Sequence, residues 1–256
     1  MPVDSGPESS PALYSNHQPG GQVSSDKGSQ PEAEAAPFSS AKPYRVGWYV
    51  DGFNLYHAVD AMAEPVLKWL DVRALAASYL KPDQVLERVV FSTAYNTWDA
   101  GKRDRHINYV RALEAVGVEV ILARFDSVKK YCRREERYCK FNEEKQSDVN
   151  LAVEALSDLY DGRVDTVFFL TADSDQIPTF KLIRRRFPEV RVYLMAPPGR
   201  LAVARDLGQH ASAKFELTAG RLRAHPLDEE YRDARGKVIA SRPAAYAAIK
   251  NQASPP

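Results

Sequence analysis

Cysteine is scarce in this sequence of 256 residues, which contains only Cys132 and Cys139. So few cysteines exclude a scaffold of several disulfides and are typical of a protein of the reducing cytoplasm. Two thiolates without a nearby histidine or a further cysteine also make an incomplete zinc site. We therefore expect a pair of free thiols in a cytoplasmic protein.

Long hydrophobic runs and a net charge are lacking as well. No stretch approaches eighteen consecutive apolar residues, which excludes a transmembrane helix, and the N-terminus lacks the basic stretch and apolar core of a secretory signal. The 35 basic and 34 acidic residues leave a formal net charge of +1. A polyanionic partner would therefore have to be recognised by a local cluster of charge.

Composition divides the chain into three parts. Residues 1–43 contain seven Pro, four Gly and nine Ser. Such a segment cannot bury enough apolar surface to offset its ordering entropy, so we expect a disordered tail. Residues 224–256 mix charged residues with Ala and Pro, and we expect a peripheral tail with a short helix near 244–249. Residues 44–223 form the remaining domain.

In this domain short apolar runs alternate with longer amphipathic stretches, which predict strands and helices respectively. Strands separated by such helices imply right-handed βαβ crossovers and an α/β fold, whose mainly parallel sheet is covered on both faces. The predicted strands are Arg45–Val50, Arg88–Ala94, Glu119–Phe125, Thr166–Leu170, Arg191–Met195 and Lys214–Leu217. The predicted helices include Val72–Tyr79, Lys102–Ala115, Val149–Tyr160, Thr179–Phe187 and Leu201–Leu207.

Acidic residues directly follow two of the predicted strands. Asp51 follows the first strand, and Asp173 and Asp175 follow the strand at 166–170. Because open α/β sheets bind ligands outside the carboxyl ends of their strands, these carboxylates lie at the edge where a site would form. Taken singly, each is explained at least as well as a turn former or a helix N-cap.

A third acidic position, Asp148, lies near the start of the helix predicted over 149–160. Helical spacing of the apolar residues predicts a buried stripe of Val149, Ala152, Val153, Leu156, Leu159 and Tyr160, and an outer face with Asn150, Glu154 and Asp158. Asp148 lies one turn before Ala152 and so borders the buried stripe, pointing toward the strand ends. The helix macrodipole would also stabilise an acid there without any catalytic role.

Convergence of these carboxylates would have a chemical consequence. Acidic groups at one edge raise each other's pKa unless a cation neutralises them. Ligation by oxygen without His or Cys favours Mg²⁺ or Mn²⁺ over zinc, and such an ion can activate water for attack on a phosphodiester. We therefore expect four metal ligands, namely Asp51, Asp148, Asp173 and Asp175.

The same residues carry a family resemblance. Segments 49–55 (Tyr-Val-Asp-Gly-Phe-Asn-Leu), 144–149 (Glu-Lys-Gln-Ser-Asp-Val) and 171–175 (Thr-Ala-Asp-Ser-Asp) resemble, in order and spacing, the signature blocks of the NYN family of PIN-like nucleases. The resemblance covers about residues 44–217. It implies a three-layer α/β/α Rossmann-like fold and divalent-metal-dependent cleavage of RNA, and its acidic positions correspond to the four aspartates.

The resemblance also implies roles for two neutral residues. Asn54, in the first block, would orient a ligand carboxylate or a metal-bound water. Thr171 would position its loop or contact an RNA phosphate. The family often has Ser-Gly-Asp where this chain has Thr-Ala-Asp, and alanine is compatible with the loop unless that position needs a positive φ.

A basic segment rich in aromatic residues precedes Asp148. Six basic residues offset by Glu135 and Glu136 give it a local charge of about +4, and Tyr131, Tyr138 and Phe141 interleave with them. This pattern suits neutralisation of a phosphate backbone and stacking on single-stranded bases. The alternative is a solvated loop without a specific role. The residues that we expect to bind RNA are Lys129, Lys130, Arg133, Arg134 and Arg137, with Lys140 in the same cluster.

The sequence therefore predicts a Mg²⁺- or Mn²⁺-dependent ribonuclease that acts on single-stranded RNA. The alternative is a non-catalytic module that keeps the fold and binds RNA or another protein. A phosphotransferase with Asp51 as nucleophile would need a second Asp where Phe53 stands, and a dinucleotide-binding enzyme would need a glycine-rich loop after the first strand. Whether the chain forms a homodimer is left open.

Overall fold

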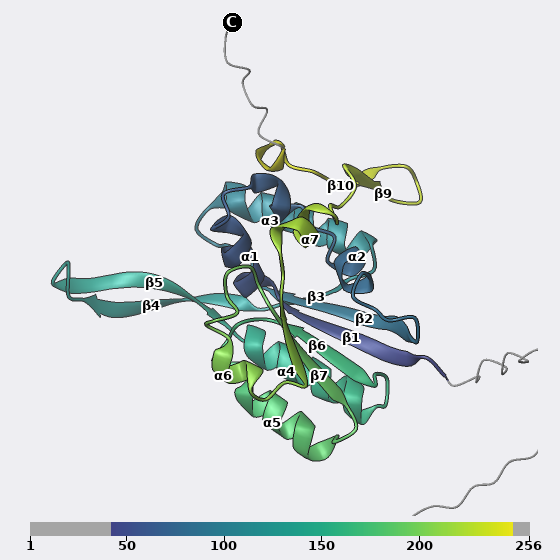
Figure 1. The fold of residues 1–256 in the computed structure, drawn as a ribbon. Helices are drawn as coiled ribbons and strands as arrows, with labels where there is room; N and C mark the ends of the chain where they lie inside the picture. Colours follow the sequence, from purple (N-terminus) through teal and green to yellow (C-terminus); the bar gives the residue numbers. More distant parts are fainter. Residues whose placement is uncertain (1–41, 248–256) are drawn as a thin grey trace, which may run out of the picture. The chain divides into compact units, whose positions relative to one another are not determined.

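The central sheet has six strands, all parallel to their neighbours (Figure 1). The computed structural model describes residues 42–247, so residues 1–41 of the expected N-terminal tail and the end of the helix predicted near 244–249 lie outside it. Across the sheet the strands follow the order β3 (Glu119–Leu122), β2 (Gln84–Thr93), β1 (Tyr44–Asp51), β6 (Thr166–Leu170), β7 (Arg191–Ala196) and β8 (Ala213–Glu216).

The order of the strands reverses between β1 and β6. From β1 the chain first builds outward through β2 and β3, and then returns to the other side of β1 to add β6, β7 and β8. Val50 of β1 pairs with Phe91 on one side and with Leu170 on the other, so the carboxyl ends of these three strands finish level. A reversal of this kind opens a crevice at the carboxyl ends, where α/β folds bind ligands.

Helices cover both faces of the sheet (Figure 1). One face carries α1 (Gly52–Asp60), α2 (Val72–Ala77), α3 (Ala100–Ala115) and α7 (Ala219–Arg223), and the other carries α4 (Ser147–Tyr160), α5 (Ile177–Arg186) and α6 (Arg205–Gly208). Side chains alternate along β1, with Trp48 and Val50 in the first core and Tyr49 in the second. The predicted three-layer α/β/α fold is confirmed. No helix within residues 42–247 is long and apolar enough to cross a membrane.

The basic segment is a β-hairpin and not a loop. The strand predicted over 119–125 is divided, because β3 ends at Leu122 and β4 (Arg124–Cys132) then pairs antiparallel with β5 (Arg137–Lys145). Figure 1 shows this hairpin extending away from the layered part of the domain. Tyr, Phe and Val residues at intervals give both segments a high β-propensity. Both cysteines lie in the hairpin and are free.

Residues 224–247 pack on the first core. A second hairpin of β9 (Glu230–Arg232) and β10 (Val238–Ser241) lies against α3, and the 3₁₀ turn η3 (Ala244–Tyr246) follows. Leu227 and Ala240 are buried, and the indole N–H of Trp69 donates to the carbonyl of Asp228 at 2.8 Å. These residues therefore belong to the packing of the domain, which their composition had not indicated.

Helix α4 presents a different face to the sheet from the one that its apolar pattern predicts. Val149, Val153 and Tyr160 are exposed by 64, 57 and 64%. The residues that the helix buries are Ser147, Leu151, Ala155, Asp158 and Leu159. The predicted stripe is therefore wrong in phase, although its member Leu159 is buried as predicted. The predicted outer residue Asp158 is completely buried.

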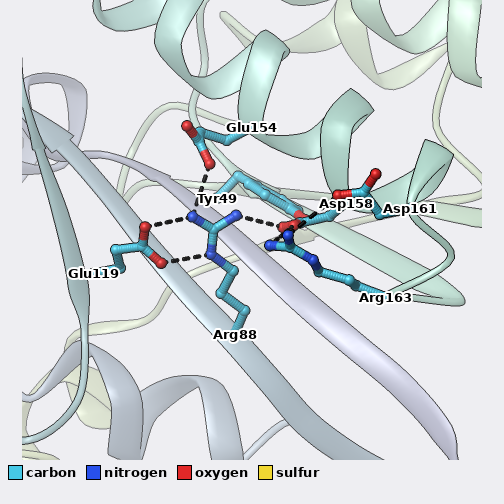
Figure 2. A network of polar contacts seen from close by, with 7 residues as sticks. All are labelled: Tyr49, Arg88, Glu119, Glu154, Asp158, Asp161 and Arg163. Carbon is cyan, nitrogen blue, oxygen red and sulfur yellow. Dashed lines mark hydrogen bonds and ion pairs between the residues drawn. The ribbon is translucent and has the colours of Figure 1, made fainter.

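A polar network explains the burial of Asp158 (Figure 2). Its Oδ2 atom accepts hydrogen bonds of 2.8 Å from both the Tyr49 hydroxyl and Arg88 Nη1, and its Oδ1 atom lies 3.3 Å from Arg163 Nη1. Arg88 completes the network through ion pairs with two further carboxylates, those of Glu119 at 2.6 Å and Glu154 at 2.7 Å. A buried charge is tolerated only with such partners, and here they hold the far end of α4 on β1 and β2.

Candidate active site

Asp51 lies at the carboxyl end of β1 and is buried, with 4% of its surface exposed. Its Oδ1 atom accepts from the backbone N–H of Asn54 at 2.9 Å, which caps α1, and its Oδ2 atom accepts from the Thr171 hydroxyl at 3.0 Å. Burial raises the pKa of Asp51 to about 7, and the carboxylates of Asp148 and Asp173 add to this rise. The aspartate is thus an N-cap and also a buried carboxylate in an unfavourable electrostatic setting.

Thr171 directly follows β6 and is completely buried. Its hydroxyl donates to Asp51 and accepts from the backbone N–H of Asp173 at 3.1 Å. Both of these contacts are inside the domain, so Thr171 positions the loop between β6 and the next helical turn. Of the two roles expected for Thr171, the structure shows the positioning of the loop, and the contact with an RNA phosphate stays a prediction.

Asn54 joins α1 to the same loop. Its Oδ1 atom accepts from the backbone N–H of Ala172 at 3.3 Å. Ala172 stands where the family often has glycine, and it does not need the left-handed backbone region. Within residues 42–247, the non-glycine residues with positive φ are Ala63, Glu136 and Gln146. The alanine therefore leaves the loop geometry unstrained.

The two acids after β6 differ in exposure. Asp173 is half-buried and caps the 3₁₀ turn η2 (Ser174–Gln176) by accepting from the backbone N–H of Asp175 at 2.9 Å. Asp175 is exposed within that turn. The capping role weighed for Asp173 is thus real, and its side chain remains close enough to Asp51 and Asp148 to raise the pKa of both.

Asp148 lies half-buried in the first turn of α4, next to a glutamine that the sequence did not single out. Gln176 Nε2 donates to the backbone carbonyl of Asp148 at 2.9 Å and to its Oδ1 atom at 3.4 Å. The Oε1 atom of Gln176 is buried and has no hydrogen-bond partner in the described structure. Burial, and then the carboxylate of Asp173, raise the pKa of Asp148. By its position in the sequence Gln176 is an ordinary residue at the start of a helix, and only its burial in the folded structure singles it out.

The start of α4 is fixed by the root of the β4–β5 hairpin. Glu144, near the end of β5, accepts from the backbone N–H of Ser147 at 3.1 Å and also from its hydroxyl. Gln146 adopts a φ of 85° between them and turns the chain from strand to helix. The sequence block at 144–149 therefore connects the hairpin to Asp148.

Gly52 permits the close approach of α1 to the sheet. A Cβ atom at this position would lie 2.5 Å from the Phe91 ring and 2.8 Å from the carbonyl oxygen of Ser92. Backbone atoms cannot yield as a flexible side chain can, so glycine is required here. The Asp-Gly-Phe-Asn block thus places Asp51 and the helix that it caps directly against β2.

The donor set fits a hard divalent cation. It offers oxygen atoms alone. Burial first, and then the neighbouring carboxylates, raise the pKa values of Asp51 and Asp148, and a cation would offset the charge of these carboxylates. The unpartnered Oε1 atom of Gln176 adds a buried acceptor beside Asp148. Within residues 42–247, no three acidic, histidine or cysteine side chains already stand as a group that could hold a metal ion. Ligation would therefore require the carboxylates to move together or to act through water.

Comparison with known proteins gives matches of different strength. The 6-hydroxy-3-succinoylpyridine 3-monooxygenase HspA of Pseudomonas putida is 25% identical over 214 residues, covering 69% of this chain and 64% of that protein. This chain thus spans slightly less than two thirds of the relative's length, and the name describes the relative alone.

Two crystal structures also match in part. A protein of unknown function from Vibrio parahaemolyticus is 19% identical with a TM-score of 0.45, covering 71% of this chain and 98% of that chain. MurG of Acinetobacter baumannii is 12% identical with a TM-score of 0.33, covering 69% of this chain and 42% of that chain.

The family comparison is more extensive. The model of the NYN domain matches residues 45–215, which is more than half of the chain and includes all three sequence blocks around the four aspartates. The chain therefore belongs to the NYN domain family of PIN-like nucleases.

Proposed function

We propose that this protein is a ribonuclease that hydrolyses RNA phosphodiester bonds in a metal-dependent reaction at the carboxyl ends of β1 and β6. The burial of Asp51 carries the proposal. An aspartate that is 4% exposed and has a pKa raised to about 7 is costly to keep, and such groups cluster at functional sites. Membership of the NYN family supports the class of reaction and RNA as the substrate.

The carboxylates would hold Mg²⁺ or Mn²⁺, with Asp51, Asp148 and Asp173 as principal ligands and Asp175 in support. Bound there, such an ion would supply an activated water and offset the charge of the phosphodiester. Without a cation the edge would repel an RNA phosphate, because several carboxylates face it. The charge of the site thus supports the proposed metal dependence.

Three neutral side chains keep the carboxylates in place. Thr171 holds Asp51, Asn54 holds the loop through Ala172, and Gln176 holds Asp148. Such orienting contacts commonly contribute a factor of about 10 to 100 in metal affinity or activity. Single-stranded RNA would be drawn to the site by the cations of the β4–β5 hairpin, namely Lys129, Lys130, Arg133, Arg134 and Arg137.

The test measures cleavage of labelled single-stranded RNA with Mg²⁺, with Mn²⁺ and with EDTA. We expect the wild type to cleave only with a divalent ion, and Asp51→Asn and Asp173→Asn to lose cleavage. Asp161→Asn is the matched control, because Asp161 caps the opposite end of α4 from Asp148. It should cleave as the wild type does.

A thermal shift supplies a second measurement that does not depend on turnover. Mg²⁺ or Mn²⁺ should raise the Tm of the wild type and of Asp161→Asn, but not that of Asp51→Asn. Equal cleavage by wild type and Asp51→Asn across several RNAs would overturn the enzymatic proposal. RNA binding without cleavage would instead identify a non-catalytic RNA-binding module.

A further inference from the structure

The β4–β5 hairpin has two faces, which its register defines. Side chains of directly paired residues lie on the same side, and successive pairs alternate between sides. The pairs Lys129↔Lys140 and Tyr131↔Tyr138 therefore share one side, which we call the tyrosine face. The pairs Lys130↔Cys139 and Cys132↔Arg137 share the other side, which we call the cysteine face.

The two faces use their positive charges differently. On the cysteine face Lys130 forms an ion pair with Glu143, and Arg137 lies 3.2 Å from Glu135. Lys129 and Lys140 on the tyrosine face are exposed, and neither forms an ion pair with any residue in the described part of the chain. The cations of the tyrosine face are thus available to an anionic partner.

The tyrosine face also carries an exposed aromatic pair. Tyr131 is 55% exposed and Tyr138 is 72% exposed, and their rings meet edge to face at a centroid distance of 5.6 Å. The hairpin extends beyond the helical layers (Figure 1), so these rings are outside both cores. Exposed aromatic faces flanked by unpaired lysines are the combination that binds single-stranded nucleic acid.

The root of the same face lies at the acidic edge. Phe125 belongs to the tyrosine face. Its ring contacts the ring of Phe53, which follows Asp51 by two residues, at a centroid distance of 5.7 Å. Its partner in the register, Glu144, holds the first turn of α4, which contains Asp148. Strand geometry places Tyr131 about 20 Å along the hairpin from Phe125. The tyrosine face thus leads from the tip of the hairpin to the proposed site.

We propose that the tyrosine face, and not the cysteine face, is the track along which single-stranded RNA reaches the acidic edge. Tyr131 and Tyr138 stack on unpaired bases, and Lys129 and Lys140 neutralise phosphates beside them. The inference builds on the proposed function, because it names the form of RNA taken and the surface that takes it. A duplex would be excluded from stacking, because its bases already stack on one another.

The experiment measures binding of a fluorescein-labelled single-stranded RNA by anisotropy in EDTA, where cleavage cannot interfere. The combination of Lys129→Gln and Lys140→Gln should raise Kd about tenfold and reduce the slope of log K against log salt by about 1.4, or 0.7 for each phosphate contact. Arg124→Gln with Lys145→Gln is the matched control on the cysteine face, where Arg124 pairs with Asp126 and Lys145 pairs with Glu143. It removes the same charge and should change Kd by less than about twofold, because both cations already have partners.

The aromatic pair is tested separately. Tyr131→Ala with Tyr138→Ala should raise Kd about fivefold or more without changing the salt slope, because stacking involves no counterion. Tyr131→Phe with Tyr138→Phe keeps the ring faces and should bind as the wild type does, which separates stacking from damage to the hairpin. Phe141→Ala, on the cysteine face, is the aromatic control.

Several outcomes would overturn the proposal. They are an equal loss of RNA affinity in the double variants of basic residues on the two faces, equal affinity for duplex RNA, or no RNA binding by the wild type. Its failure is distinguishable from failure of the ribonuclease. If RNA binding depends on the tyrosine face but no RNA is cleaved, the binding track is supported and the ribonuclease activity is rejected. If cleavage requires Asp51 while substitutions on the tyrosine face leave RNA affinity unchanged, the ribonuclease activity is supported and the binding track is rejected.

Discussion

The hydroxyl of Thr171 donates to Oδ2 of Asp51 across the boundary between β6 and β1, at a distance of 3.0 Å. Asp51 ends β1 and Thr171 directly follows β6, and the order of the sheet reverses between these two strands. One hydrogen bond thus joins two of the three sequence blocks that identify the family. Because both residues are buried, the bond is shielded from water and fixes the orientation of the carboxylate.

Removal of the Thr171 hydroxyl should reduce turnover more than binding. Thr171→Val leaves the Oδ2 atom of Asp51 without its donor and the N–H of Asp173 without its acceptor. We expect kcat for RNA cleavage to fall about 10- to 100-fold with little change in KM. Thr171→Ser keeps the hydroxyl and should restore most of the rate. An unchanged kcat for Thr171→Val would show that this bond does not position the carboxylate.

Gln176 should affect metal affinity through Asp148. Gln176→Met keeps the volume of the side chain but removes the amide that donates to Asp148. The affinity for Mg²⁺ or Mn²⁺, measured by the dependence of Tm on ion concentration, should weaken about tenfold. Gln209→Met, at the exposed C-cap of α6, is the control. Equal ion dependence in both variants would remove Gln176 from the site.

The network around Asp158 should behave as a coupled unit in urea denaturation. Arg88→Met removes the cation closest to a completely buried carboxylate and should lower the free energy of unfolding by about 3 kcal/mol. Adding Asp158→Asn removes the charge that Arg163 alone would then offset, and should recover part of that loss. Additive effects of the two substitutions would contradict the coupling.

His106 should make the protein less stable in mild acid. Burial lowers the pKa of His106 to about 4, and its ring lies 3.0 Å from the Thr93 hydroxyl. An unfolded histidine titrates near pH 6.5. The folded state therefore keeps its full stability above that pH and loses it as the pH falls from about 6.5 to 4, by roughly 3 kcal/mol.

Urea denaturation at a series of pH values checks this prediction. The dependence of the free energy of unfolding on pH should be shallower in His106→Gln than in the wild type between these limits. Superimposable pH profiles would show that protonation of His106 does not oppose folding.

The alternation of strands and helices could be predicted from the sequence, because it depends on local patterns. A parallel sheet buried on both faces needs near-continuous apolar strands such as Thr166–Leu170, whose observed bounds are those predicted. Charged residues are disfavoured in the buried middle of such strands and gather at their ends, which placed Asp51 and Asp173 at the sheet edge. The strand boundaries near the basic segment were harder to predict, because β3 and β4 follow each other almost without a break.

The contacts within the candidate site could not be predicted from the sequence. The sequence suggested Asp148 through a helical phase that proved wrong, although the residue still lies beside Asp173. Nothing in the sequence near Gln176 indicated its contact with Asp148, because the two residues are brought together only when α4 packs beside the η2 turn. The two unlike faces of the β4–β5 hairpin likewise follow from a register that pairs distant positions.

Sequence alone thus determined the class of fold, the family and the set of acidic residues, because each depends on residue type and spacing along the chain. Only the tertiary structure decided which acids are buried and what surrounds them. Asp158 is paired with arginines far from the site, whereas Asp51 is buried without a basic partner in the described part of the chain and feels the charges of Asp148 and Asp173. The physical reason is that the solvation of a charge depends on the partners that folding brings within a few ångströms, and not on its neighbours along the chain.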